Sequence, residues 1–231
     1  MKKDSPAYIL GFMLIIAVVF GTGVAVVHYS TQDMLQRNER LHRNRVLTQA
    51  FELDAEDDSP QAYEQAVEEN LKLRTIEELG REWEIFTRSR DGNDVGFIFT
   101  GLGFWDRIIG VIVLTPDLQQ VVNLQILEQS ETPGLGARIT QPWFTEQFKG
   151  LEIAWDQPIN QRIIIGPAPQ PNAVNQVDAI TGASQTSIAL MNILNRELEG
   201  FREVYTENFS SADKPISPSA SNEKRKRAHN G

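Results

Sequence analysis

The sequence predicts an α+β protein: a single N-terminal transmembrane helix, followed by a domain with an antiparallel sheet plus helices. Three observations lead to this class. The run from Ala7 to Val27 carries no charge and is long enough, at about 1.5 Å per residue, to cross the roughly 30 Å core of a bilayer. Short apolar runs separated by turn residues fill the middle of the chain. A pattern of apolar residues three or four apart begins near Ser187 and predicts a helix.

Composition excludes several classes of function. The net charge is −9, which argues against a nucleic-acid partner, because phosphate backbones require a basic surface. The sequence has no cysteine, so disulfides, iron–sulfur clusters and cysteine-ligated zinc are excluded. His28, His42 and His229 all lie outside the region from Leu79 to Tyr205. That region therefore cannot build a Ser-His-Asp hydrolase or a histidine-ligated haem, and redox work there needs an organic cofactor.

The N-terminal region is predicted to be an uncleaved anchor and a helical linker. The alternative, a cleaved signal peptide, has a shorter apolar core and a small-residue cleavage site, which is not evident before Val27-His28-Tyr29. We expect a cytoplasmic stub and transmembrane anchor over residues 1–30 and a helical stalk or linker over residues 31–78. Polar helices are predicted at Thr31–Leu53 and Gln61–Leu73. Basic residues flank the apolar run on both sides, so charge alone leaves its orientation open.

The globular domain is expected over residues 79–206, and a disordered tail over residues 207–231, which lack a core-forming pattern. Strands are predicted at Trp83–Thr87, Val95–Thr100, Asp106–Leu114 and Val121–Leu127, with shorter apolar runs at Leu151–Ala154 and Arg162–Ile165. Between them we expect a turn at Asp91–Asn93, a short helix at Thr140–Phe148 and a stiff loop at Pro167–Pro171. The alternation along Val121–Leu127 predicts a sheet with one face on the core. The last helix is expected to end at Gly200.

The segment Asp178–Ser187 lies just ahead of this last helix. Thr181 to Ser184 are therefore placed at a helix N-terminus, where free N–H groups and the helix dipole suit a phosphate. Gly182 and Ala183 leave room for close approach to the backbone, and Ser184 offers a hydroxyl that can carry a covalent group. Taken alone, the segment favours an ordinary helix cap, in which Thr181 or Ser184 accepts hydrogen bonds from first-turn amides.

A second segment, Glu131-Thr132-Pro133-Gly134-Leu135-Gly136, follows a strand-like run upstream. Together the two segments resemble the FMN-binding domain family, which includes the C subunit of the sodium-pumping NADH:quinone reductase (NQR) and the G subunit of the Rnf electron-transport complex. In that family the motif D-x-x-(S/T)-G-A-(T/S)-x-(T/S)-S carries FMN as a phosphoester on the hydroxyl residue after Gly-Ala, which is Ser184 here. The usual residue is Thr, so Ser184 departs from the pattern, although a Ser hydroxyl can form the same ester. The resemblance covers about Leu79 to Tyr205.

The resemblance implies a set of cofactor-binding residues: Ser184, Glu131, Thr132, Gly134, Leu135, Asp178, Thr181, Gly182, Ala183 and Thr186. In the upstream loop, Pro133 rigidifies the chain, while Gly134 and Gly136 permit positive φ and close approach to a flat ring. Without the downstream motif, this loop is an ordinary Pro-Gly turn. The short helix adds three aromatic residues that are flavin contacts or, more commonly at this spacing, core residues: Trp143, Phe144 and Phe148.

The resemblance also implies a function, an electron carrier with covalent FMN in an Rnf- or NQR-type ion-translocating complex. The expected place is the bacterial inner membrane, with a single span and the FMN domain on the periplasmic side. Expected partners are integral membrane subunits, the lipid bilayer and a flavin transferase that acts on FAD. No GxGxxG follows a strand and opens a helix, so no NADH site is predicted. Two alternatives stay open: a membrane-anchored FMN-binding sensor or assembly module, and a structural anchor without cofactor.

Overall fold

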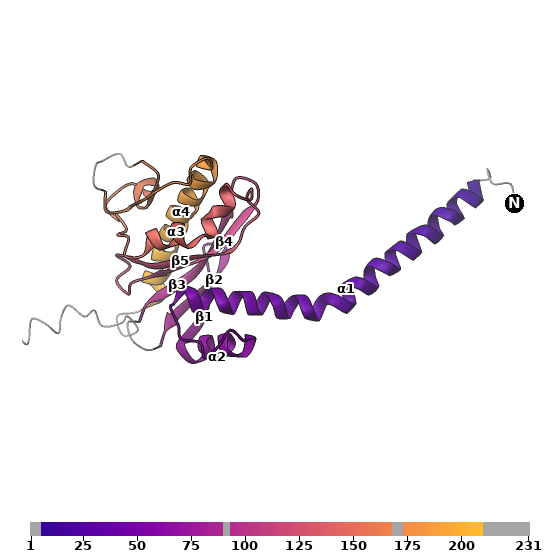
Figure 1. Ribbon diagram of the computed structural model, residues 1–231, viewed down its shortest axis with the longest axis horizontal. Helices are drawn as coiled ribbons and strands as arrows, with labels where there is room; N and C mark the ends of the chain where they lie inside the picture. The colour runs from indigo at the N-terminus through magenta and orange to yellow at the C-terminus, as the bar shows by residue number, and fades with distance from the viewer. Residues whose placement is uncertain (1–5, 90–92, 168–172, 210–231) are drawn as a thin grey trace, which may run out of the picture. The chain divides into compact units, whose positions relative to one another are not determined.

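The computed structural model describes residues 6–89, 93–167 and 173–209 (Figure 1). The chain forms two compact units, Met1–His42 and Arg43–Gly231. The first unit contains most of helix α1 (Pro6–Ala50), whose last residues belong to the second unit. A stretch of α1 with a mean hydropathy of 2.6 is long and apolar enough, by length and composition, to cross a membrane. The apolar anchor and the polar helix expected after it are one continuous helix.

The second unit is built on a five-stranded antiparallel sheet whose strands lie side by side in chain order. The strands are β1 (Leu71–Glu78), β2 (Arg81–Arg88), β3 (Val95–Leu102), β4 (Arg107–Leu114) and β5 (Val121–Glu128). Short connections make this order possible. Strands β1 and β2 are joined by Leu79 and Gly80, both with positive φ, as a tight hairpin turn requires. With the helices that cover it, the sheet confirms the α+β class.

Helix α4 (Ser184–Asn208) covers one face of the sheet and contributes to the main core. Its Phe201 stacks on Phe97 of β3 with 4.1 Å between ring centroids. The expectation that Gly200 ends this helix is wrong, because α4 continues to Asn208. A Cβ at Gly200 would lie 3.0 Å from the ring of the buried Trp83. The glycine therefore permits close packing of α4 on Trp83.

The opposite face of the sheet is also covered, so the expectation of a single face on the core is wrong. Apolar residues from the end of α1 and from the chain just after it pack there: Val46, Leu47, Ala50 and Phe51. They meet buried residues of β2 and β4: Phe86, Val111 and Val113. The alternate residues of β4, Ile112 and Leu114, belong to the main core. Apolar side chains on both sides of β4 are the pattern of a strand buried on both faces.

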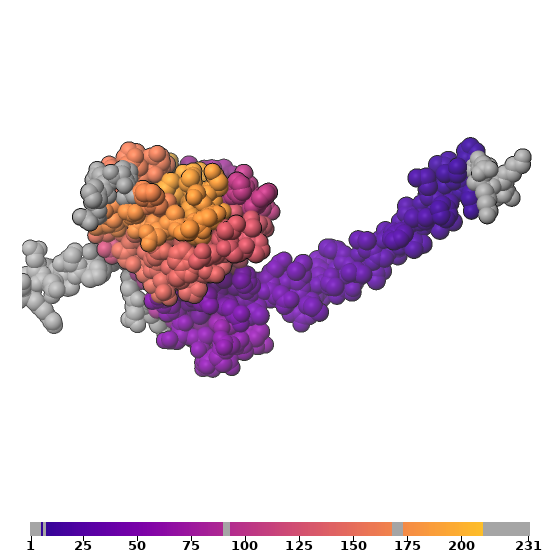
Figure 2. Space-filling view, turned by 45° about the horizontal axis from the view of Figure 1, so that its top comes forward, coloured from indigo at the N-terminus to yellow at the C-terminus, as the bar shows by residue number. Residues whose placement is uncertain are grey.

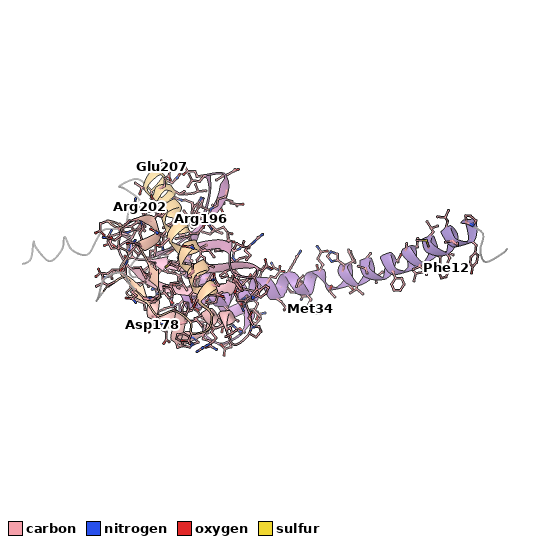
Figure 3. All side chains as sticks on the ribbon, turned by 90° about the horizontal axis from the view of Figure 1, so that it is seen from above. Phe12, Met34, Asp178, Arg196, Arg202 and Glu207 are labelled. Atoms are coloured by element: carbon pink, nitrogen blue, oxygen red, sulfur yellow. The ribbon has the colours of Figure 1, made fainter. Side chains whose placement is uncertain are left out.

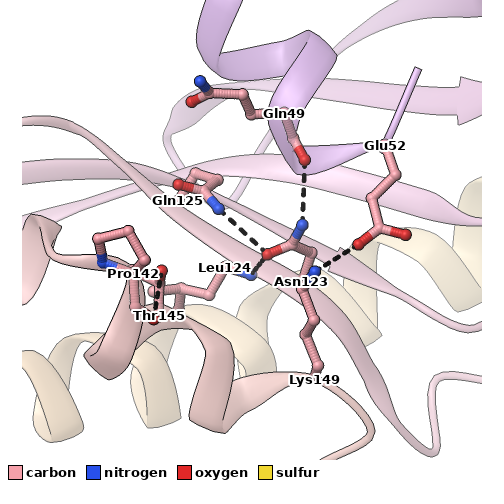
Figure 4. Close-up of polar contacts among 8 residues, drawn as sticks. All are labelled: Gln49, Glu52, Asn123, Leu124, Gln125, Pro142, Thr145 and Lys149. Carbon is pink, nitrogen blue, oxygen red and sulfur yellow. Dashed lines mark hydrogen bonds and ion pairs between the residues drawn. The ribbon is translucent and has the colours of Figure 1, made fainter. Parts of the chain in front are cut away.

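A buried amide joins the end of α1 to strand β5 (Figure 4). The Asn123 Nδ2 donates a hydrogen bond to the Gln49 carbonyl at 3.0 Å, and its Oδ1 accepts one from the Leu124 amide at 2.9 Å. Close by, Lys149 Nζ pairs with Glu52 Oε1 at 2.6 Å. The last turns of α1 are therefore a structural part of the domain.

The stretch expected to be a helical linker contains a strand of the sheet. Helix α2 (Pro60–Asn70), expected to reach Leu73, ends at Asn70. The chain then enters β1, and all eight of its residues pair with β2. Strand β1 lies at the edge of the sheet and mostly exposes its side chains, so it lacks the apolar alternation that predicts a strand. The compact domain thus begins well before Leu79, its expected start.

Short segments complete the second unit: η1 (Gly136–Thr140), α3 (Pro142–Thr145), η2 (Glu146–Phe148), η3 (Ile159–Gln161), and the parallel pair β6 (Ile164–Ile165) and β7 (Gln176–Val177). The helix expected at 140–148 is therefore present as short helical turns. The strand expected at 151–154 is reduced to one bridge between Gln120 and Glu152. Three expectations lie wholly or mostly outside the described residues: the turn at 91–93, the loop at 167–171 and the tail at 207–231.

Candidate functional site

The predicted phosphate motif lies at the N-terminus of α4, which starts at Ser184. Gly182 has a φ of +81°, which glycine adopts without strain, and it turns the chain into the helix. The N-cap position is occupied by Ala183, and no side chain makes a cap hydrogen bond there. The interpretation of Thr181 or Ser184 as the helix cap is therefore wrong. Both of these residues are exposed.

A different hydroxyl closes this turn. Ser187 Oγ accepts a hydrogen bond from the Ile180 amide at 3.1 Å and donates one to the Ala183 carbonyl at 3.1 Å. Because the buried Ser187 holds the turn from inside, the hydroxyls of Thr181 and Ser184 are not needed for it. An uncapped first turn at the positive end of the helix dipole, with an exposed hydroxyl beside it, suits a phosphate group.

Glu131 and Thr186, both predicted to contact the cofactor, are buried and bonded to each other. Glu131 is 4% exposed and Thr186 is 3% exposed. Thr186 Oγ1 donates a hydrogen bond to Glu131 Oε2 at 2.6 Å. The other carboxylate oxygen, Oε1, accepts from the amides of Phe104 and Trp105 at 2.8 and 3.1 Å. Both oxygens thus have partners inside the domain, and Glu131 joins three segments of the chain.

The Pro-Gly loop lies against the phosphate motif. Gly134 is exposed and has a φ of +76°, as expected. The exposed side chain of Leu135 packs over Gly182, where a Cβ would lie 3.2 Å from Leu135 Cδ2. Thr132 is also exposed, and its Oγ1 accepts a hydrogen bond from the indole N–H of Trp105 at 2.9 Å. The loop therefore places Leu135 beside Gly182, two residues before the predicted attachment point.

Gly136 differs from Gly134, because it does not use the positive φ that a glycine permits. It is buried, and a Cβ on it would overlap Thr186 Oγ1 and lie 2.9 Å from Glu131 Oε2. Because Gly136 has no side chain, Thr186 of α4 can pack closely against its backbone. The backbone at Gly136 is thus shaped for internal packing.

A cleft of about 570 Å³ lies beside the motif and is lined by two of its residues, Asp178 and Thr181. Asp178 is exposed at the surface of the domain (Figure 3), and its amide donates to Gln147 Oε1 at 2.8 Å. Arg138 and Trp143, from the short helical turns after the Pro-Gly loop, also line the cleft. The cleft is therefore lined by residues of the phosphate motif and by residues that follow the Pro-Gly loop in the chain.

Arg138 is a cleft residue that the sequence interpretation missed. Its guanidinium lies 4.9 Å from the centroid of the Trp143 ring, and its Nε donates to Gln141 Oε1 at 3.3 Å. No ion pair engages it among the residues that the structure describes, so its charge is available to an anion. A signal was present in the sequence, since Arg138 is the single Lys or Arg between Arg107 and Lys149.

The aromatic residues after the loop divide between cleft and core. Trp143 is 40% exposed and lines the cleft. Phe144 and Phe148 are fully buried in the main core with 5.5 Å between their ring centroids, so the core interpretation is confirmed for these two.

The predicted site residues fall into an outer and an inner group. The outer group is exposed: Thr132, Gly134, Leu135, Asp178, Thr181, Gly182 and Ser184. Two of its members, Asp178 and Thr181, line the cleft. The inner group is buried beneath it: Glu131, Ala183 and Thr186. In Figure 2 the coral surface of the middle of the chain adjoins the orange surface of the part that contains α4. The structure thus brings the two predicted motifs together, with only part of them accessible to a ligand.

Known proteins with similar sequences include a family of domains and two subunits of ion-translocating enzymes. Residues 103–199 match the FMN-binding domain family. The chain is 30% identical over 113 residues to the C subunit of the Na(+)-translocating NADH-quinone reductase of Pasteurella multocida, a match that covers 47% of this chain and 43% of that protein. It is 27% identical over 154 residues to the G subunit of the ion-translocating oxidoreductase complex of Methanosarcina acetivorans, which covers 58% of this chain and 76% of that protein.

A solved structure has the same fold. The crystal structure of the C subunit of the Na(+)-translocating NADH-quinone reductase from Parabacteroides distasonis matches with a TM-score of 0.63 and 22% identity, over 74% of this chain and 95% of that one. This likeness confirms the fold, and the sequence matches confirm the resemblance to the FMN-binding domain family and its two kinds of subunit. The chain spans less than half the length of the Pasteurella protein.

Proposed function

Because residues 103–199 match the FMN-binding domain family, we propose that this protein is a membrane-anchored electron carrier with FMN bound covalently as a phosphoester on Ser184. The observation that carries the proposal is the start of α4, where an exposed serine hydroxyl lies on an uncapped first turn next to a cleft. The protein acts within an Rnf- or NQR-type complex. This part is supported by the names of its relatives, which are subunits of ion-translocating enzymes.

The residues of the site fit an FMN group. The free N–H groups of the first turn and the positive end of the α4 dipole favour its phosphate. Arg138, which forms no ion pair within the described part of the chain, adds a positive charge at the cleft. The volume of about 570 Å³ lies within the usual range of small-molecule sites, roughly 300–1,000 Å³. When bound, the flavin supplies the redox chemistry, while the chain fixes its position and surroundings.

Attachment requires a separate flavin transferase and FAD. The Ser184 Oγ forms a bond to the phosphorus on the FMN side of FAD, the bond from that phosphorus to the AMP phosphate breaks, and AMP leaves. The serine proton passes to solvent or to the transferase. No electrons are transferred in this step, so no oxidant is needed. An exposed hydroxyl is a requirement of this chemistry, and Ser184 meets it.

Helix α1 anchors the chain in the inner membrane by its apolar stretch, and the FMN domain lies on the periplasmic side, where it exchanges electrons with integral membrane subunits of the complex. Purification from native membranes tests this assignment. We expect several integral membrane subunits to accompany the chain, whereas isolation as a lone single-span protein contradicts the relay and favours a sensor.

Intact-mass measurement tests the covalent bond. Full-length chain, expressed with a flavin transferase and solubilised in detergent, should gain the mass of FMN minus water and keep its yellow fluorescence after denaturation. Ser184→Ala should lose both signals, while Ser184→Thr, which keeps a hydroxyl, should retain them. A wild-type chain that gains no mass contradicts covalent attachment, and a mass gain that persists in Ser184→Ala places the bond elsewhere.

A further inference from the structure

The carboxylate of Glu131 is buried, and Glu131 does not line the cleft. Its two oxygens accept three hydrogen bonds, from the amides of Phe104 and Trp105 and from the hydroxyl of Thr186. No cation pairs with it among the described residues. Burying a carboxylate without a counter-charge is costly unless donors replace its water shell. The three donors do so, and they come from two separate parts of the chain.

The carboxylate of Glu131 occupies space that side chains at two glycines would otherwise fill. A Cβ at Gly103 would lie 2.5 Å from Glu131 Oε1, and a Cβ at Gly136 would lie 2.9 Å from Oε2. The carboxylate is thus enclosed on both sides by backbone that carries no side chain. Such an enclosure fixes where the two oxygens lie, so the length of the residue 131 side chain determines the distance between the segments that it joins.

One of these segments is the first turn of α4. Thr186 is the third residue of the helix, two positions after Ser184, and no side chain caps this helix end. The bond from Thr186 Oγ1 to Glu131 Oε2, at 2.6 Å, ties this first turn, on which Ser184 lies, to the Pro-Gly loop, whereas the bonds of Ser187 close the turn on itself. A carboxylate near a helix N-terminus is also favoured by the helix dipole.

We propose that Glu131 is a positioning residue for flavin attachment: the reach of its side chain, and not its charge, sets the location of the Ser184 hydroxyl. This inference rests on the proposed function of Ser184. It assigns Glu131 no contact with the flavin, in contrast to the expectation from the sequence. Two substitutions separate reach from charge, because Asp keeps the charge and shortens the side chain by one methylene, while Gln keeps the length and removes the charge.

The amide of Glu131→Gln can reproduce the three contacts. Its oxygen accepts from the Phe104 and Trp105 amides, and its NH₂ donates to Thr186, whose hydroxyl accepts as readily as it donates. Glu131→Asp cannot reach both sides, because a methylene accounts for about 1.5 Å. Misplacement of a reacting group by about 1 Å can cost roughly 100-fold in rate. We therefore expect attachment to slow by about 10- to 100-fold in Glu131→Asp and by less than about 3-fold in Glu131→Gln.

The experiment measures initial rates of FMN incorporation into full-length chain in detergent, with FAD and limiting transferase, by intact mass. A positioning role predicts that Glu131→Asp lowers kcat while the KM for the protein substrate stays near the wild-type value. Asn195→Ala is the matched control, since Asn195 lies on the same helix and makes two buried hydrogen bonds, with Ile163, away from the site. It should lower the unfolding midpoint and leave the incorporation rate unchanged.

A second readout needs no flavin. Amide hydrogen exchange of the unlabelled chain should be faster at Phe104, Trp105 and Ser187 in Glu131→Asp and close to wild type in Glu131→Gln. Equal incorporation rates in wild type and Glu131→Asp overturn the proposal, and so does a Glu131→Gln chain as slow as Glu131→Asp. A wild-type chain that takes up no FMN instead refutes the attachment chemistry, and the exchange rates then still decide whether Glu131 holds the turn.

Discussion

The carboxylate of Glu199 lies between two guanidinium groups on α4 and the neighbouring η3 region. Arg162 donates a hydrogen bond to its Oε2, and Arg202 Nη2 lies 3.5 Å from the same oxygen. Both guanidinium groups also lie over the Trp155 ring, at 4.9 and 4.6 Å from its centroid; Arg202 is labelled in Figure 3. The hydrogen bond from Arg162, aided by both charges, lowers the pKa of Glu199 below its ordinary value of 4.5.

This lowered pKa predicts a pH-dependent contribution to stability. Above pH 4.5 Glu199 is ionised in both folded and unfolded chains, so its favourable interactions are fully present. As the pH falls through the lower pKa of the folded state, the unfolded chain takes up the proton first and the contribution is lost. Glu199→Gln should therefore be less stable than wild type at pH 7, and the difference should shrink progressively below pH 4.5.

Urea unfolding at several pH values measures this difference. Glu207→Gln, at an exposed position of the same helix (Figure 3), serves as the control and should follow the wild type at every pH. A constant gap between Glu199→Gln and wild type from pH 7 to pH 3 would show that the Arg162 hydrogen bond does not depend on the charge of Glu199.

At the level of the element, α4 contains a glycine where helix propensity disfavours one. In an exposed helix, replacing Gly by Ala gains about 1 kcal/mol. At Gly200 the added Cβ would lie 3.0 Å from two atoms of the Trp83 ring, and overpacking a core costs typically 1–3 kcal/mol. We therefore expect Gly200→Ala to lower the free energy of unfolding by up to about 2 kcal/mol.

A double-mutant cycle checks the cause. In a Trp83→Phe background the smaller ring leaves space for the Cβ, so Gly200→Ala should raise stability relative to that background. The free energies of unfolding of the four chains, measured in urea, give the coupling between the two positions. Independent, additive effects would mean that Trp83 is not what excludes a side chain at Gly200.

The elements that the sequence predicts correctly are those stabilised by their own apolar pattern. Strands β2 to β5 carry that pattern, and α4 shows the spacing of a helix packed on a core. Strand β1 is missed because most of its side chains are exposed, and its hydrogen bonds to β2 do much to hold it in the sheet. The role of Gly200 is missed because a helix-ending glycine and a glycine packed under a ring look alike until the partner, Trp83, is known.

In the candidate site, too, local features are predicted from the sequence, whereas contacts between distant residues are not. Sequence reasoning predicts the loop, the helix N-terminus and the exposed Ser184, because turn residues and helix patterns are local signals. It cannot predict that Glu131 points inward, since its partner Thr186 is 55 residues away in the chain. Arg138 and Trp143 enter the cleft through the packing of short helical turns, which no periodic pattern specifies.

On the scale of the whole molecule, the domain needs the end of α1, because residues there cover the face of the sheet opposite α4. Phe51, just beyond the helix, is 1% exposed, and a Cβ at Gly96 of β3 would lie 2.7 Å from its ring. Phe51→Ala should therefore lower the free energy of unfolding by about 3–5 kcal/mol, the usual cost of emptying a buried phenylalanine site. Leu73→Ala, at an exposed position of β1, should change it by no more than about 0.5 kcal/mol.

Thermal or urea unfolding of the two variants makes this comparison. Equal stabilities would mean that the Val46–Phe51 segment only rests on the sheet, and that a domain cut free of it keeps its fold. The expected result instead predicts that fragments which begin after Phe51 aggregate, because Phe86, Val111 and Val113 lose their cover.

The hydrogen bond between Glu131 and Thr186 also bears on the order in which the domain folds. Each strand of the sheet pairs with its neighbour in the chain, so the sheet can assemble from nearby parts, whereas the tie across 55 residues requires the costlier closure of a long loop. We expect the first turn of α4 to take its place late, after the rest of the domain is formed. Under the proposed function, a transferase that recognises this turn would therefore add flavin only to chains whose domain is completely folded.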